Sequence, residues 1–72
     1  MTTYTYYAVF QLPDSDIGGY IVSDERTFDS MEDLFLFCTE NQEYEARRIV
    51  RGINVTQQYY DFDAQKWVTF GQ

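Results

Sequence analysis

A single cysteine, Cys38, occurs in this chain of 72 residues, so no disulfide can form within it. A domain of this length buries only about 60% of the surface that its unfolded chain exposes, so its core needs large apolar side chains. The sequence supplies seven tyrosines, six phenylalanines and one tryptophan, and aromatic rings bury much area while losing few rotors. We therefore expect one domain, residues 1–72, held together by aromatic packing.

The first part of the chain has the pattern of a hairpin. The even positions of Thr3–Leu12 form an apolar face at period two, which is typical of a strand. Pro13 ends this strand, and residues 14–19 have the composition of a turn. Tyr20–Val22 then predicts a short second strand, paired to the first.

A helix is predicted next. One helical face collects apolar side chains at positions i, i+3, i+4 and i+7, namely Met31, Leu34, Phe35 and Cys38. At its start, Asp29 with Glu32 resembles a capping box, and Ser30 with Asp33 is the alternative register. The helix is expected to end near Asn41.

Three further strands are predicted after the helix, at Tyr44–Val50, Val55–Tyr60 and Lys66–Phe70. The order β-β-α-β-β-β, with short connections, favours antiparallel pairing. A single helix covers only one face of such a sheet. The predicted fold class is therefore α+β: an antiparallel sheet of four to five strands with one helix packed on one face.

The charge of the chain is strongly negative and uneven. The formal net charge is −7, and the stretch from Pro13 to Glu45 holds ten acidic residues and one arginine. Such a field repels nucleic acid and attracts basic surfaces. Because nucleic-acid binding depends on Lys and Arg that neutralise phosphates, we expect no direct nucleic-acid partner and instead a basic protein surface.

Catalytic chemistry has few candidates in this sequence. The chain has no histidine, which excludes Ser-His and Cys-His nucleophile pairs. Cys38 lies on the apolar helical face, where a thiol acts as a small buried hydrophobe. A chain this short has little material for a substrate cleft. We therefore predict a protein that is not an enzyme, with no catalytic residue, no cofactor and no bound metal.

The sequence also predicts where the protein acts. Its first residues lack the basic and apolar regions of a signal peptide, and no apolar run approaches the roughly 20 residues that span a bilayer. Small secreted domains usually depend on disulfides. These features predict a cytoplasmic protein (in the host cytoplasm if a phage encodes it) without a membrane partner.

One segment partly resembles an EF-hand calcium loop. Asp14, Asp16, Gly19 and Glu25 would occupy loop positions one, three, six and twelve. Gly18, at position five, offers no side-chain ligand, and a predicted strand stands where the entering helix would be. A solvated hairpin turn is the favoured interpretation, and a calcium-responsive module using Asp14–Glu25 is the alternative.

The solvent face of the predicted helix carries carboxylates around Leu36. An apolar side chain ringed by charges can form the centre of a small interface, whereas a solvated face with one exposed leucine is the alternative. Together with the acids of the first turn and its flanks, this face supplies the predicted partner-binding residues: Asp14, Asp16, Asp24, Glu25, Asp29, Glu32, Asp33, Leu36, Glu40 and Glu43.

Aromatic residues exceed what one helix can cover, so some rings on the first, fourth and fifth predicted strands should be exposed. Exposed Tyr and Trp often mark binding surfaces. Cross-strand pairing that only supports the sheet is the alternative, and a homodimer through that face would satisfy both. The secondary candidates are Tyr7, Tyr59, Tyr60 and Trp67.

A small basic patch, formed by Arg47, Arg48 and Arg51, follows the acidic stretch. Arginines beside many carboxylates usually form ion pairs within the protein. We therefore expect these three side chains to form ion pairs within the protein. The alternative is that they are free to contact a partner.

At the level of class, the chain resembles the small acidic inhibitors that phages and mobile elements encode, including anti-CRISPR and anti-restriction proteins. The resemblance lies in its short length, the acid-rich stretch Asp14–Glu45, and the aromatic end Tyr59–Asp63 with Lys66–Val68. It implies a non-catalytic inhibitor whose acidic surface, as a nucleic-acid mimic, blocks a nucleic-acid-binding site on a host protein complex. The competing hypothesis is a structural or adaptor subunit that binds through an aromatic sheet face.

Overall fold

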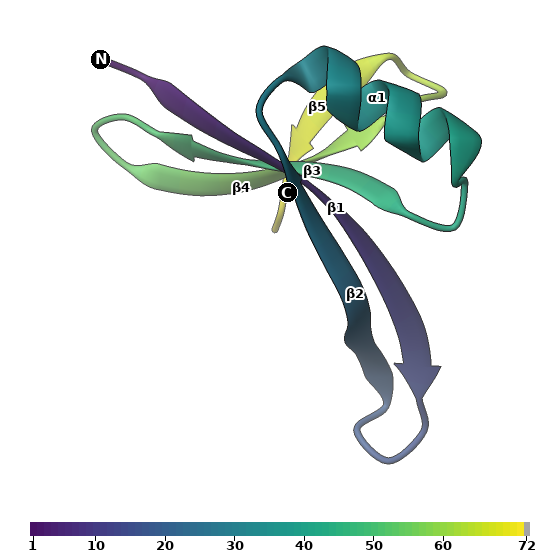
Figure 1. The fold of residues 1–72 in the computed structure, drawn as a ribbon. Coiled ribbons are helices and arrows are strands. Elements are labelled where there is room, and N and C mark those ends of the chain that lie inside the picture. Colours follow the sequence, from purple (N-terminus) through teal and green to yellow (C-terminus); the bar gives the residue numbers. More distant parts are fainter. Residues whose placement is uncertain (72) are drawn as a thin grey trace.

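A computed structural model describes residues 1–71 of the chain. Its elements are β1 (Thr3–Asp14), β2 (Gly19–Phe28), α1 (Met31–Glu40), β3 (Glu45–Arg51), β4 (Val55–Asp61) and β5 (Lys66–Thr69). The strands form one antiparallel sheet in the order β2-β1-β3-β4-β5, and α1 lies over one face of it (Figure 1). The predicted α+β fold with a single covering helix is therefore confirmed.

The core lies where α1 crosses β1 and β3. Ala8 and Ala46 face each other across these strands, and both are fully buried. Because both side chains are small, the helix can approach the sheet closely and seat Leu34 and Cys38 against it. Aromatic side chains surround this centre, as the composition predicted: Tyr6, Phe28, Phe35, Phe37, Tyr44, Tyr60 and Trp67.

The cap of α1 follows the alternative register. The Ser30 hydroxyl accepts a hydrogen bond from the backbone N–H of Asp33 at 3.2 Å, so the capping role predicted for Asp29 is wrong. The core-facing position predicted for Met31 is also wrong, because this side chain is 38% exposed. Leu34 is the first residue of α1 that packs in the buried cluster. The first helical turn, which contains Met31, lies outside the part of the helix that covers the sheet.

Strand β2 is longer than Tyr20–Val22, which was the predicted extent. It continues to Phe28, which pairs with Tyr6. The polar residues of this extension have little intrinsic preference for a strand. They adopt one because β1 offers a free backbone edge along this whole length, and because an edge strand tolerates charged side chains.

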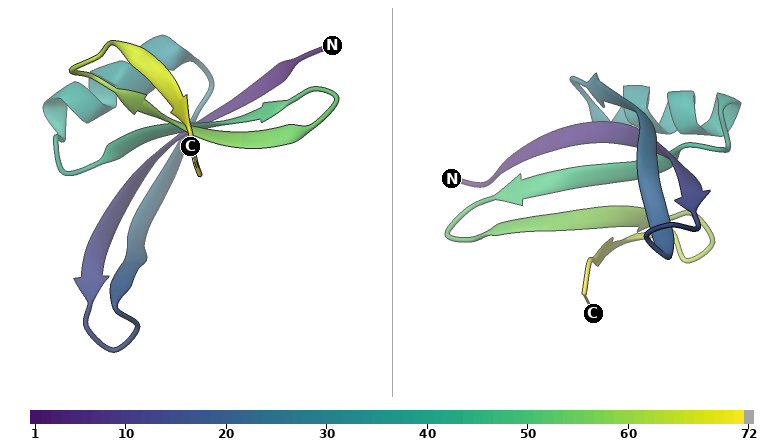
Figure 2. Two further views of the ribbon diagram at one scale, coloured as in Figure 1. Left: turned by 180° about the vertical axis from the view of Figure 1, so that it is seen from behind. Right: turned by 90° about the horizontal axis from the view of Figure 1, so that it is seen from below.

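The hairpin of β1 and β2 projects from the body of the protein. β3 pairs with β1 only as far as Val9, and the β1–β2 register shifts between Phe10 and Gln11. Beyond this shift, Gln11–Val22 forms a two-stranded arm that points away from α1 (Figures 1 and 2). The radius of gyration is 12.8 Å, against about 11 Å for a compact chain of this length.

Candidate functional site

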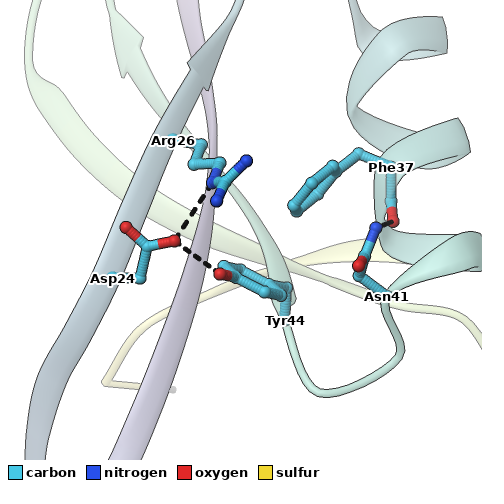
Figure 3. A network of polar contacts seen from close by, with 5 residues as sticks. All are labelled: Asp24, Arg26, Phe37, Asn41 and Tyr44. Atoms are coloured by element: carbon cyan, nitrogen blue, oxygen red, sulfur yellow. Dashed lines mark hydrogen bonds and ion pairs between the residues drawn. The ribbon is translucent and has the colours of Figure 1, made fainter.

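The base of the arm is fixed by a polar contact (Figure 3). Oδ2 of Asp24 accepts hydrogen bonds from the Tyr44 hydroxyl at 2.5 Å and from Nε of Arg26 at 3.0 Å. The Tyr44 ring also packs against Phe10 and Phe37, with ring centroids 5.6 and 4.9 Å apart. Strand β2 is thereby tied to the end of the helix and to the segment that leads into β3.

The end of α1 is built into the same region. The side-chain amide and the backbone N–H of Asn41 both donate to the carbonyl oxygen of Phe37, at 2.9 and 2.8 Å. The guanidinium of Arg26 lies 5.4 Å from the centroid of the Phe37 ring. The Phe37 ring therefore lies between Arg26 at the base of the arm and Tyr44, so the base of the arm packs against the end of α1.

The polar contact shifts the acidity of both oxygen groups. The hydrogen bond from Tyr44, followed by that from Arg26, lowers the pKa of Asp24 below its ordinary value of 3.8. The hydrogen bond to Asp24, followed by partial burial, raises the pKa of Tyr44 above 10.0. Asp24 therefore stays ionised at neutral pH and is engaged within the protein.

The substitution Tyr44→Phe is expected to raise the pKa of Asp24 toward 3.8, because it removes the main hydrogen bond to the carboxylate. A depressed carboxyl pKa stabilises the fold above the unfolded pKa, and this contribution is lost as the pH falls through the folded pKa. The difference in the free energy of unfolding between the wild type and Tyr44→Phe should therefore be smallest at the lowest pH, where Asp24 is protonated in both proteins. NMR titration of the Asp24 carboxyl carbon measures the shift, with Tyr4→Phe as the control. An unchanged pKa in Tyr44→Phe would refute the assignment.

The structure distributes the predicted acidic residues among four places. Asp14 and Asp16 lie at the tip of the arm, and Asp24 and Glu25 lie at its base. Asp29, Glu32 and Asp33 lie at the start of α1, and Glu40 and Glu43 lie at its end. The tip points away from α1 (Figure 1). The acids of the tip are therefore separate from those of the helix, whereas Asp24 contacts Tyr44 beside the end of α1. No single patch contains every predicted residue.

On the helix, Leu36 lies on the solvent side as expected, with 59% of its surface exposed. Acidic residues follow and precede it on the same helix. It is the only strongly exposed aliphatic side chain beyond the first turn of α1. The helical surface thus offers a small apolar centre with an acidic surround.

The arm carries a larger apolar surface that sequence reasoning missed. Five of its side chains are between 43% and 65% exposed: Leu12, Ile17, Tyr20, Ile21 and Val22. Leu12 pairs directly with Ile21, so both lie on one face, while Tyr20 and Val22 lie on the other. A small protein has little apolar area to spare, so this exposed apolar surface on both faces of the hairpin makes the arm a candidate interaction site.

The calcium-loop alternative is corrected by the geometry of the arm. Asp14 pairs with Gly19 beside the turn, whereas Glu25 pairs with Val9. Five residues of extended strand lie between Gly19 and Glu25, so the two are about 20 Å apart. Loop positions one and twelve therefore do not converge, and residues 1–71 contain no group of three or more acidic or cysteine side chains placed to hold a metal.

The secondary aromatic candidates separate onto two faces. Tyr60 and Trp67 lie on the helix side and pack against the core. Tyr7 and Tyr59 lie on the opposite face, where both flank Arg47 in the sheet register. The expectation that Tyr7 is exposed is wrong, because its side chain is buried on this face. Burial, as the main cause, raises the pKa of Tyr7.

The arginines have aromatic as well as acidic partners. Arg47 forms the expected ion pair with Glu45 at 2.6 Å. The guanidinium of Arg48 instead lies 4.7 Å from the centroid of the Tyr4 ring and 4.3 Å from that of the Trp67 ring, and its Nε donates to Gln58 at 2.7 Å. Such cation–π contacts stabilise a positive charge without a carboxylate. Arg51 donates to the Thr5 hydroxyl at 2.7 Å.

A shallow cavity of about 410 Å³ lies beside the end of α1, lined by Cys38, Thr39, Gln42, Tyr44, Phe62 and Asp63. Cys38 is buried, as predicted. Burial, with a smaller effect of Glu45, raises the pKa of its thiol to about 11. The thiol is therefore protonated at neutral pH, whereas nucleophilic attack requires the thiolate.

These features define a small α+β protein with one antiparallel sheet, one covering helix and a projecting two-stranded arm. Comparisons with known protein families, with curated proteins and with solved structures find no match to the chain. Within residues 1–71, the helix is too short to cross a membrane.

Proposed function

We propose that this protein is a non-catalytic, protein-binding inhibitor whose arm blocks a basic, nucleic-acid-binding site on another protein complex. The exposed apolar cluster of the arm carries the proposal. Carboxylates flank that cluster, with Asp14 and Asp16 at the tip and Glu25 at the base. An apolar centre with a charged rim is the usual anatomy of a protein interface.

The arm is favoured over the helix because it offers more apolar surface. Five exposed apolar side chains lie on the arm, whereas the helix exposes two, Met31 at its start and Leu36 among its acids. Apolar burial would supply affinity, and the carboxylates would set the on-rate and the choice of a basic partner. The contact of Asp24 with Tyr44 holds the base of the arm in place, which lowers the entropy lost on binding.

The charge of the protein favours a nucleic-acid-binding site as the target. A net charge of −7 attracts surfaces rich in Lys and Arg, which are the surfaces that bind phosphates. A carboxylate accepts the same charge-assisted hydrogen bonds from arginine as a phosphate does. Inhibition of the anti-CRISPR or anti-restriction type, which the class resemblance implies, would work in this way.

The proposal is tested with two variants of equal charge change. The arm variant carries Asp14→Asn, Asp16→Asn and Glu25→Gln, and the helix variant carries Asp29→Asn, Glu32→Gln and Glu40→Gln. Asn at position 14 can still accept the turn hydrogen bond from the backbone N–H of Asp16, which measures 2.9 Å. A partner is first captured from cells that make the protein, then purified, and its affinity for each variant is measured at several salt concentrations.

We expect the arm variant to bind about tenfold or more weakly at low salt, with a flatter salt dependence, and the helix variant to bind within about twofold of the wild type. The wild-type protein should also displace an oligonucleotide from the partner. A partner without affinity for nucleic acid, or a loss of binding confined to the helix variant, would overturn the proposal.

One observation favours a second candidate function, that of an adaptor binding through the sheet. Arg48 lies beside the rings of Tyr4 and Trp67, and Tyr4 is 47% exposed. Arg, Tyr and Trp are the residues most enriched at interface hot spots. In the same experiment, this candidate predicts an affinity that is insensitive to salt and that falls in Tyr4→Ser.

A further inference from the structure

The outer edge of β2 has free backbone groups. β2 is the terminal strand of the sheet, so alternate N–H and C=O groups along it point away from β1 and have no strand to pair with in residues 1–71. Natural proteins usually protect such edges with charged side chains, proline or a covering loop. The segment Gly19–Val22 has no charge and no proline, and the register shift between β1 and β2 lies just beyond Val22. These four residues therefore form a regular edge without such protection.

We propose that a second copy of this chain pairs with that edge, strand β2 against strand β2, around a twofold axis at Ile21. In this antiparallel register Ile21 faces Ile21 of the second copy, and Tyr20 faces Val22 of the second copy. Every apolar residue of the segment therefore meets an apolar residue. Aromatic and β-branched side chains placed directly opposite each other stabilise strand pairs. The inference does not depend on the proposed function.

The register is selected by what the alternatives place opposite each other. A pairing that brings Asp24 opposite Arg26 of the second copy also sets Glu25 against Glu25. Like charges directly opposite are destabilising. The register centred on Ile21 avoids this contact, because Asp24 then lies beyond Gly19, where β2 of the second copy begins.

Pairing would also bring together the apolar side chains on both faces of the arm. Leu12 lies beside Ile21 within each copy, so both copies of these two residues would gather on one face of the joined sheet. Tyr20 and Val22 would gather on the other. The dimer therefore accounts for four of the five exposed apolar residues of the arm, all except Ile17 at the tip.

Charge gives this association a salt dependence of its own. Each copy carries a net charge of −7, and the register brings the acidic tip of one arm toward the acidic base of the other. Added salt screens this repulsion and should strengthen the dimer. Binding to a basic partner should instead weaken with salt. The two uses of the arm exclude each other, and they can fail separately.

Sedimentation equilibrium of the purified protein tests the proposal, over about 10 µM to 1 mM protein and at about 50 and 500 mM salt. The mass should rise from 8.6 kDa toward twice that value, at lower protein concentration in high salt. Ile21→Lys places two lysines opposite each other and should weaken association about tenfold or more. Ile53→Lys is the matched control, because Ile53 is fully exposed on the β3–β4 turn.

A cross-link tests the register itself. Cys38 is buried, so an added cysteine is the accessible thiol. Ile21→Cys should form a covalent dimer on mild oxidation, because directly opposite positions of antiparallel strands lie within disulfide range. Val22→Cys should do so at least about tenfold more slowly, since it faces Tyr20 of the second copy. A monomer at all concentrations, equal weakening by both lysine substitutions, or equal cross-linking would overturn the proposal.

Discussion

Replacing Leu34 by alanine is expected to lower the free energy of unfolding by about 3 kcal/mol, within the range for a fully buried leucine. Leu34 has no exposed surface and packs with Ala8 and Ala46. Neighbouring alanines have no flexible side chain to move into the cavity, so little of the loss can be recovered. A single core in a domain of this size supplies only about 3–5 kcal/mol. We therefore expect the variant to be largely unfolded at 37 °C, as measured by circular dichroism and urea denaturation.

Leu36→Ala is the matched control for this prediction. It removes the same atoms from the same helix, two positions away, at a side chain that is 59% exposed. The change should stay within about 0.5 kcal/mol, as is usual for surface sites. Similar losses in both variants would mean that α1 does not pack as the structure describes.

The helix shows how much of this fold sequence periodicity can predict. The spacing of Leu34 and Cys38 predicted the buried face, and Leu36 was expected on the solvent side. Periodicity gave a direction around the helix axis but not the point along it where the sheet begins to cover it. Met31 has the correct spacing and is nevertheless exposed, because its position depends on contacts with distant strands.

The arm was not predictable for a related reason. Tyr20–Val22 was assigned to a strand correctly, but its burial depends on whether a third strand covers the hairpin. β3 begins at Glu45 opposite Val9, and the register shift after Phe10 follows from pairing between strands, not from local sequence. The separation of the arm acids from the helix acids likewise arises only when the elements are placed in space.

The arginines fall between these two cases. Consecutive strand residues point to opposite faces, so Arg47 and Arg48 had to separate. Their partners depend on strand order, because Trp67 reaches Arg48 from two strands away, across β4. Composition suggested ion pairs for Arg47, Arg48 and Arg51, whereas of these three only Arg47 has one in the part of the chain that the structure describes.

Excision of the arm is expected to abolish partner binding and self-association while the fold remains. Replacing Leu12–Val22 by Asn-Gly would join Gln11 directly to Ser23 through a two-residue turn, for which Asn-Gly is the favoured sequence. The core and the contact of Asp24 with Tyr44 both lie outside the excised segment. We therefore expect a folded monomer whose urea midpoint stays near that of the wild type, with partner affinity reduced more than about 100-fold, since the interface centre is gone.

A second variant separates the loss of the arm from the loss of its apolar surface. Leu12→Ser, Ile21→Ser and Val22→Ser keep the arm and its carboxylates but remove three of its exposed apolar side chains. If apolar burial supplies affinity, this variant should lose most of the partner binding that excision removes. The weak binding that remains should depend on salt, because the carboxylates still attract the basic partner. An excised protein that still binds its partner would place the interface on the helix or the sheet. An excised protein that still dimerises would rule out the pairing centred on Ile21, because the segment Gly19–Val22 is then absent.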